Sequence, residues 1–166
     1  SGKPSCTHYL AQALHRATAP CGVIGTLGSG LHGALALGSN TTPDAVSIQS
    51  ALAGFQRAGV SRVVMEVSSH ALDQGRVHGV KFTTAVFTNL SHDHLDYHGD
   101  MAAYEAAKRR LFTWPELKSV VINADDPVGR RLVADVDASV ARAVYGLNPE
   151  AVQAVAVGQR LWADSV

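Results

Sequence analysis

Short apolar segments alternate along this chain with longer segments whose apolar residues recur every three or four positions. The short segments have the length of strands and the longer ones the length of helices. The segment Arg62 to Val67 is nearly all apolar, which is typical of a parallel strand buried on both faces. The predicted strands are 22–27, 62–67, 84–89, 119–123 and 140–145. This alternation predicts an α/β fold with a mostly parallel sheet and helices on both of its faces.

Capping residues mark the starts of several predicted helices. A side-chain oxygen that accepts a backbone N–H, followed by proline at the first helical position, favours a helix start. The predicted helices are 6–18, one that begins at Pro43 with Thr42 as its cap, 101–112 after Asp100, and 128–136 after Asp126-Pro127.

Polar residues follow three of the predicted strands directly. They are Glu66 to His70, Thr88 to His94, and Asn123 to Asp126, and five of the eight histidines fall between His70 and His98. Because open parallel sheets bind ligands beyond the carboxyl ends of their strands, this edge is the predicted functional site.

Composition narrows the class of protein. The 166 residues fit one domain, and 14 basic residues balance 14 acidic ones, which favours neither a nucleic-acid nor a membrane partner. No apolar run approaches the ~18 residues of a membrane helix, and no signal peptide opens the chain. Cys6 and Cys21 form no CxxC pair and suggest no disulfide framework, so we expect a protein of the reducing cytoplasm. We also expect it to be a monomer.

The first residues look like the second half of a phosphate-binding loop. In such loops, backbone N–H groups and a lysine hold phosphates at a helix N-terminus, which here would use Gly2 and Lys3. Pro4 stands where a serine or threonine is usual, and it removes both an N–H and a metal-binding hydroxyl. Ser5 is the residue that could supply that hydroxyl.

Glu66 is a carboxylate inside an apolar strand. Burial of a carboxylate is costly unless it is paired, protonated or bound to a metal. Together with His94, which follows the next strand, it could hold Mg²⁺, which accepts such mixed and water-completed shells. The alternative is a strand-end residue that reaches solvent.

Lys108 falls on the apolar face of its predicted helix, beside Tyr104 and Leu111, while Glu105 and Arg109 form an i,i+4 pair elsewhere. Lys108 either extends its ammonium into water along a buried stem or carries a change that removes its positive charge.

The run from His92 to His98 permits another interpretation. His92, His94, Asp96 and His98 resemble the metal-binding loop of metallo-β-lactamase-like hydrolases, although Tyr97 is an extra residue in that spacing. A hydrolase would leave the phosphate-loop segment and Lys108 unexplained.

Taken together, several segments resemble the Mur ligase family, nearest to members that act on UDP-N-acetylmuramoyl-L-alanyl-D-glutamate. The resemblance covers about residues 1 to 132. The matching segments are Gly25-Thr26-Leu27-Gly28, Asn40-Thr41-Thr42-Pro43, 65–72, Gln74 with Arg76, 86–99, 104–108 and 123–126. It implies a P-loop-like central, ATP-binding domain spanning residues 1–166, cut from a longer enzyme at both ends.

The resemblance also implies roles for individual residues. Lys3 would contact ATP phosphates with Gly2, Ser5 would be a magnesium ligand, and Asn123 would begin the segment that contacts adenine. Lys108 would be carbamylated and help to hold a second Mg²⁺ with Glu66 and His94. The residues expected to bind the UDP-linked substrate are Asn40, Thr41, Thr42, Ser68, Gln74 and Arg76.

The reaction that the resemblance implies is ATP-dependent amide-bond formation in peptidoglycan precursor synthesis. The D-glutamate carboxylate would receive the γ-phosphoryl group, and the amine of an amino acid, expected to be meso-diaminopimelate, would attack the acyl-phosphate. A folylpolyglutamate synthase-like ligase and a non-catalytic nucleotide-binding module are the alternatives.

Overall fold

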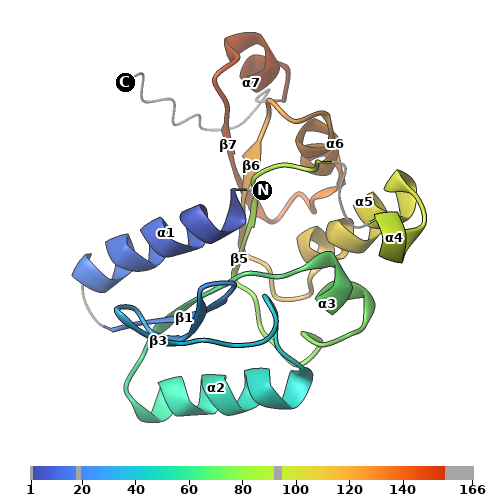
Figure 1. Ribbon diagram of the computed structural model, residues 1–166. Coiled ribbons are helices and arrows are strands. Elements are labelled where there is room, and N and C mark those ends of the chain that lie inside the picture. Colours follow the sequence, from blue (N-terminus) through green and yellow to red (C-terminus); the bar gives the residue numbers. More distant parts are fainter. Residues whose placement is uncertain (1, 18–19, 92–94, 156–166) are drawn as a thin grey trace. The chain divides into compact units, whose positions relative to one another are not determined.

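The computed structural model describes residues 2–17, 20–91 and 95–155 (Figure 1). Residues 2–80 form one compact unit, the N-terminal unit, and the described residues from 81 onward form a second, the C-terminal unit. Within the described part of the chain, no helix combines the length and the apolar character needed to cross a membrane.

The sheet of the N-terminal unit has the strand order β3-β2-β1-β4. β1 (Cys21–Gly25) runs parallel to β4 (Arg62–Met65). It runs antiparallel to β2 (Gly28–Leu31), which in turn pairs with β3 (Ala34–Ala36). β1 and β4 confirm two predicted strands, so their carboxyl ends meet at one edge.

The antiparallel strands β2 and β3 were not predicted from the sequence. They are four and three residues long, and glycine occupies two positions of β2, so no alternating apolar pattern marks them. At Gly30, whose φ is 151°, a Cβ atom would lie 2.5 Å from the carbonyl oxygen of Ala34. The hairpin therefore depends on glycine rather than on apolar side chains.

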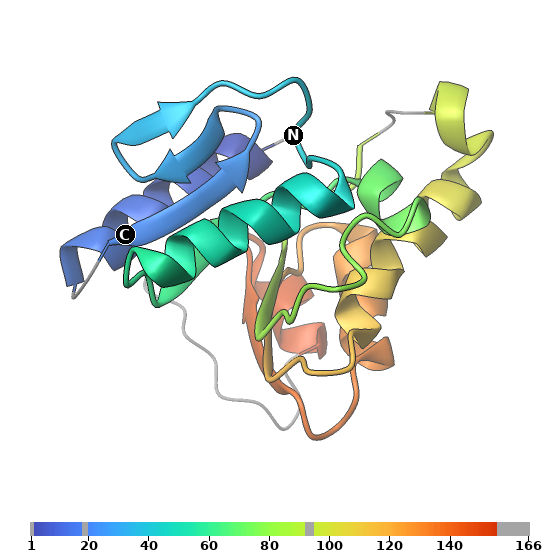
Figure 2. The same cartoon turned by 90° about the horizontal axis from the view of Figure 1, so that it is seen from below.

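Helices α1 (Lys3–Ala17) and α2 (Ala45–Arg57) cover opposite faces of this sheet, as Figures 1 and 2 show. Cys21 and Val23 pack with Ala11 of α1 in one buried cluster. Gly22, between them on β1, faces Phe55 of α2, whose ring lies 2.9 Å from the position of an added Cβ. Successive residues of a strand point to opposite faces of the sheet. The prediction that helices cover both faces is therefore confirmed for this sheet.

Two predicted helix starts of the N-terminal unit were wrong. α1 begins at Lys3 rather than at Cys6, so the expected phosphate loop is the helix's first turn. Pro4 fits there, because a first-turn N–H has no partner within the helix. The second helix is capped by Asp44, which accepts the N–H of Ser47 at 2.9 Å, and not by Thr42. The hydroxyl of Thr42 is held instead by the segment that follows β4.

The C-terminal unit contains a parallel sheet with the order β5-β6-β7. All three strands were predicted, with ends that differ by two residues or fewer. The strands are β5 (Thr84–Phe87), β6 (Ser119–Asn123) and β7 (Ala141–Tyr145). The helices of this unit are α4 (Leu95–His98), α5 (Met101–Arg109), the 3₁₀ helix η1 (Arg110–Thr113), α6 (Pro127–Asp135) and α7 (Pro149–Val155). One further short helix, α3 (Ser69–Asp73), belongs to the N-terminal unit.

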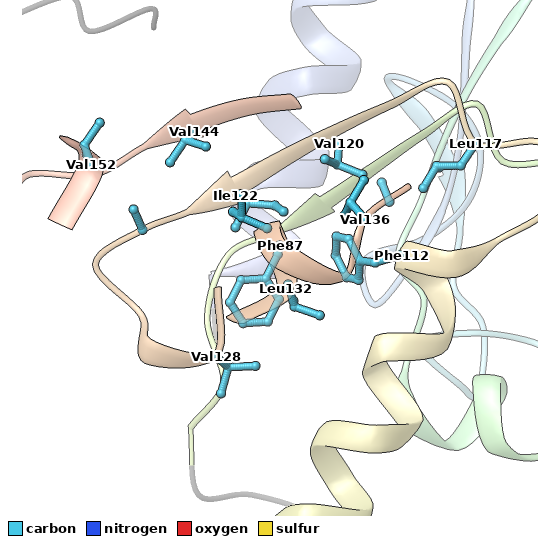
Figure 3. Close-up of a cluster of buried hydrophobic side chains, with 13 residues drawn as sticks. Phe87, Phe112, Leu117, Val120, Ile122, Val128, Leu132, Val136, Val144 and Val152 are labelled. Atoms are coloured by element: carbon cyan, nitrogen blue, oxygen red, sulfur yellow. The ribbon is translucent and has the colours of Figure 1, made fainter. Parts of the chain in front are cut away.

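Aliphatic and aromatic side chains fill the core of the C-terminal unit (Figure 3). Val120 and Ile122 of β6 are fully buried, as is Leu132 of α6 except for 1% of its surface. The rings of Phe87 and Phe112 meet edge to face, with centroids 6.0 Å apart. This core fixes where the polar ends of β5 and β6 emerge.

Two predicted caps in the C-terminal unit are confirmed. Asp100 accepts the N–H of Ala103 at 2.8 Å, and Asp126 accepts that of Val128 at 2.8 Å. The second oxygen of Asp126 accepts the N–H of Leu90 at 2.7 Å, which ties the chain after β5 to the start of α6. The α/β class is confirmed, but hydrogen bonding divides the five predicted strands between two sheets.

Candidate functional site

A buried carboxylate lies at the carboxyl end of β4. Glu66 is 4% exposed, and its own N–H donates to the carbonyl oxygen of Ile24 at 2.8 Å, which extends the pairing with β1 by one residue. The backbone N–H of Thr26 donates to Oε1 and the hydroxyl of Thr26 contacts Oε2, each at 3.0 Å. The carboxylate of Glu66 is therefore buried at the sheet edge and hydrogen-bonded by Thr26, and it does not simply reach into solvent.

Gly25, the last residue of β1, makes room for this carboxylate. A Cβ atom at position 25 would lie 2.4 Å from Oε1 of Glu66 and 3.0 Å from its Cδ, well inside van der Waals contact. Only glycine at position 25 lets the carboxylate lie against the strand end.

Thr42 connects the segment after β3 to the end of β4. Its side chain is fully buried. Its hydroxyl donates to the carbonyl oxygen of Glu66 at 2.8 Å and accepts the N–H of Ser68 at 2.9 Å. With the hydroxyl engaged in both directions, the side chain of Thr42 positions its neighbours.

The hydrogen bonds around Glu66 and Thr42 extend to residues that are partly or fully exposed. The hydroxyl oxygen of Thr41 lies 3.0 Å from that of Thr26. Ser68 caps α3 by accepting the N–H of Ala71 at 3.1 Å, which leaves its own proton for a further acceptor. Asn40 is exposed, and its amide reaches the hydroxyl of Ser39 at 3.4 Å.

The guanidinium of Arg76 is anchored at two of its nitrogens. Nη1 donates to the carbonyl oxygen of Thr42 at 2.9 Å, and Nε donates to Oε1 of Gln74 at 2.7 Å. An arginine fixed on one side presents its other N–H groups in a defined direction, which suits an anionic partner.

The structure thus brings most of the predicted substrate residues together around Glu66. Thr41, Thr42, Ser68, Gln74 and Arg76 all belong to one hydrogen-bonded network, and Asn40 adjoins it in sequence. The sequence analysis did not single out Gly25 and Thr26 as site residues. The sequence contains a signal for both residues, because the Gly-Thr pair lies at the end of the predicted strand 22–27, which is next to the strand that leads to Glu66.

The N-terminus of α1 offers the features of an anion site. The carbonyl of Gly2 accepts the first helical bond, from the N–H of Cys6 at 3.0 Å, and an added Cβ at Gly2 would meet nothing within 4 Å. The first turn holds Lys3 and Ser5 and no acidic residue. Helix N-terminal N–H groups beside a lysine fit the chemistry of a phosphate group.

At the sheet edge of the C-terminal unit, Asn123 holds two strand ends together. Its Nδ2 donates to the carbonyl of Thr88 at 2.8 Å, and its Oδ1 accepts the N–H of Asp125 at 2.9 Å. Asp125 in turn accepts the N–H groups of Leu147 and Asn148 at 2.7 and 3.0 Å. These two bonds, that from Leu147 first, lower the pKa of Asp125.

Lys108 lies on the same helix face as Tyr104, as predicted. Its Nζ lies 4.8 Å from the centroid of the Tyr104 ring, which is 3% exposed. His98 stacks on that ring with centroids 5.3 Å apart. The predicted Glu105–Arg109 pair is present at 3.7 Å.

Of the residues that suggested a hydrolase, Asp96 is exposed and His98 packs on an aromatic ring. His92 and His94 lie outside the described residues. No three His, Cys, Asp or Glu side chains in the described part of the chain are arranged to hold a metal ion.

The donor chemistry around Glu66 nevertheless fits Mg²⁺. Magnesium is commonly bound through one or two carboxylates together with substrate phosphates and water. Each carboxylate oxygen of Glu66 accepts one donor from Thr26 and keeps a further lone pair.

Comparison with known proteins gives consistent results. The Mur ligase middle domain family matches residues 1–164. The chain is 51% identical over its whole length to a UDP-N-acetylmuramoyl-L-alanyl-D-glutamate–2,6-diaminopimelate ligase of Ralstonia nicotianae, of which it covers 32%. It is 58% identical over 132 residues, 80% of the chain, to the protein of that name from Ectopseudomonas mendocina, of which it covers 27%.

A solved structure of a ligase of that name agrees with this chain at a TM-score of 0.82 and 36% identity. The match covers 89% of this chain and 30% of the other. The chain therefore spans about a third of the length of the relatives that it matches.

The fit at Gly25 predicts the outcome of a single methyl addition. Gly25→Ala should displace the Glu66 carboxylate and lower the free energy of unfolding by about 1–3 kcal/mol, the usual cost of overpacking. Urea unfolding measures this loss, and amide exchange at Thr26 should become faster. Gly38→Ala is the control, because an added Cβ there has its nearest neighbour at 4.0 Å. Equal stability of the two variants would contradict the packing argument.

Proposed function

Because the chain belongs to the Mur ligase middle-domain family, we propose that it is the central, ATP-binding third of a longer enzyme. This enzyme extends UDP-N-acetylmuramoyl-L-alanyl-D-glutamate by one amino acid. The reaction is amide-bond formation in peptidoglycan precursor synthesis. The proposed amino acid is meso-diaminopimelate, and the names of the relatives specify 2,6-diaminopimelate for those proteins.

The observation that carries this proposal is the hydrogen-bonded network around Glu66. It joins a buried carboxylate to five residues that the family resemblance assigns to the UDP-linked substrate. A site built this way can hold a substrate carboxylate for phosphoryl transfer. Positioning and charge neutralisation supply most of the catalysis in such a transfer.

Each part of the site has a proposed task. The first turn of α1, with Gly2, Lys3 and Ser5, binds the phosphates of ATP, and Asn123 begins the segment next to adenine. Arg76 binds an anionic group of the UDP-linked substrate. The γ-phosphoryl group of ATP passes to the D-glutamate carboxylate and ADP leaves. The amine of the incoming amino acid then attacks the acyl-phosphate, and phosphate leaves as the amide bond forms.

Magnesium is proposed as the metal. Ser5 is proposed as a ligand of one ion, and Glu66, His94 and a carbamate on Lys108 as ligands of a second. When bound, magnesium would neutralise negative charge on the phosphoryl oxygens. Glu66 supports this role because it is already oriented by two donors from Thr26. Lys108 is half-buried, and its Nζ lies 4.8 Å from the centroid of the Tyr104 ring.

The protein is further proposed to be a cytoplasmic monomer that binds neither nucleic acid nor membranes. Its support is the balance of 14 basic and 14 acidic residues and the presence of two free cysteines, Cys6 and Cys21.

The proposal is tested by an ADP-release assay. The full-length enzyme should release ADP only when the UDP-linked dipeptide and diaminopimelate are both present, whereas the 166-residue chain alone should show no turnover. The chain alone covers only a third of its relatives, and effective catalysis needs both reactants held together. Turnover by the isolated chain would show that the missing parts are not needed for catalysis. A full-length enzyme that releases no ADP with both substrates present would overturn the proposed function.

Arg76→Ala should weaken binding of the UDP-linked substrate. A charge-assisted hydrogen bond contributes about 1.5–3 kcal/mol, so the KM for this substrate should rise roughly 10- to 150-fold while the KM for ATP stays within about twofold. Arg57→Ala is the control, since Arg57 is an exposed arginine of the same unit. An unchanged KM for the UDP-linked substrate would reduce Arg76 to a surface charge.

Lys108→Arg should be as damaging to activity as Lys108→Ala if Lys108 works as a carbamate. Arginine keeps the positive charge and the contact with the ring, but it cannot supply an anionic ligand. Activity of the full-length Lys108→Ala enzyme should recover in part when acetate or formate is added. Near-normal activity of Lys108→Arg would instead show that the lysine acts as a cation, as its position over Tyr104 allows.

A further inference from the structure

Leu147 lies just beyond the carboxyl end of β7, and 96% of its surface is exposed. Single exposed leucines are ordinary on protein surfaces and need no explanation by themselves. Leu147 is distinguished by its place, because Tyr145, two residues before it, is the register partner of Asn123 at the end of β6. Parallel sheets bind ligands at this edge, and the proposed function assigns the adenine of ATP to the segment that begins at Asn123.

The backbone of Leu147 is fixed by the carboxylate of Asp125. Oδ2 accepts the N–H of Leu147 at 2.7 Å, and Oδ1 accepts that of Asn148 at 3.0 Å. The N–H of Asp125 donates to Oδ1 of Asn123 at 2.9 Å, and Nδ2 of Asn123 donates to the carbonyl of Thr88 at 2.8 Å. One series of hydrogen bonds therefore crosses the carboxyl ends of β5, β6 and β7.

Gly146 allows this turn to approach Asp125 closely. A Cβ atom at position 146 would lie 2.6 Å from Oδ1 of Asp125 and 3.1 Å from Cγ2 of Val152, which belongs to α7. The turn is thus packed from two sides, while the side chain of Leu147 remains outside. An apolar side chain on a backbone that is already ordered costs little further entropy when a ligand covers it.

We propose that Leu147 binds ATP by packing against one face of the adenine ring, and that Asp125 is the positioning residue that holds Leu147 in place. An aromatic base needs an apolar surface for its faces and polar groups for its edge, which is the usual composition of a small-molecule site. Asn123 and Leu147 offer the two kinds of group side by side on neighbouring strand ends. This inference rests on the proposed function of the site.

Truncation of Leu147 tests the contact in the full-length enzyme. Leu147→Ala should raise the KM for ATP roughly 5- to 10-fold, as expected when about half of a leucine side chain loses its apolar cover. Leu147→Met, which keeps the apolar volume, should stay within about twofold of wild type. The KM values for the UDP-linked dipeptide and for diaminopimelate should not change, and neither should the free energy of unfolding.

Leu37→Ala is the matched control, because Leu37 is 90% exposed and belongs to the N-terminal unit. It should leave the KM for ATP unchanged. An unchanged KM for ATP in Leu147→Ala, or an equal rise in Leu37→Ala, would overturn the adenine contact. A full-length Leu147→Ala enzyme that loses stability but keeps its KM for ATP would do the same, since another part of the enzyme would then cover Leu147.

A double-mutant cycle tests the role of Asp125. An amide has one acceptor oxygen, so in Asp125→Asn one of the two N–H groups loses its partner. The KM for ATP should rise roughly 2- to 5-fold in Asp125→Asn, the range of one lost hydrogen bond. In a Leu147→Ala background the same change should add less than about twofold, because no side chain remains to be positioned.

Equal effects of Asp125→Asn in both backgrounds would overturn the positioning role and leave the Leu147 contact to its own test. A wild-type enzyme without ATP-dependent ligase activity would instead overturn the proposed function, whereas an active wild-type enzyme whose KM for ATP is insensitive to Leu147→Ala contradicts only this inference.

Discussion

The candidate site depends on one constraint, which is that a carboxylate is buried at the carboxyl end of a parallel strand. Such a group is stable only when donors surround it, because burial without partners is costly. The donors for Glu66 come from Thr26, and the space comes from the missing side chain of Gly25. The strand end, the glycine and the threonine therefore form a single unit of structure, in which a change at one position moves the others.

The same constraint extends to the loop that carries the predicted substrate residues. The carbonyl of Glu66 accepts the hydroxyl of Thr42, and the carbonyl of Thr42 accepts a guanidinium N–H of Arg76. Each bond satisfies a backbone carbonyl group near the sheet edge. The network thus positions functional side chains by the same contacts that stabilise the fold.

In the C-terminal unit, side chains perform a comparable task at the edge of a second parallel sheet. Asn123 bridges the ends of β5 and β6, and Asp125 and Asp126 hold the segments that follow β7 and β5. The sequence indicates the polar residues after the strands as candidates for chemistry. The structure shows that part of their work is to satisfy backbone N–H and carbonyl groups, and any contact that Asn123 makes with adenine has to be compatible with that bracing.

The sequence alone predicts the α/β class, five of the seven strands found in the described residues, and the caps Asp100 and Asp126, because these follow from local patterns of apolar and capping residues. The apolar surroundings of Glu66 and Lys108 mark both residues as candidates, and the family resemblance adds Arg76. Only the tertiary structure revealed the glycine-dependent hairpin of β2 and β3, the cap at Asp44 in place of Thr42, and the roles of Gly25 and Thr26. The physical reason is the same in each case. A hydroxyl or a glycine has no single preferred partner in sequence, and what it does is decided by which strand end, helix or carboxylate the fold brings within 3 Å of it.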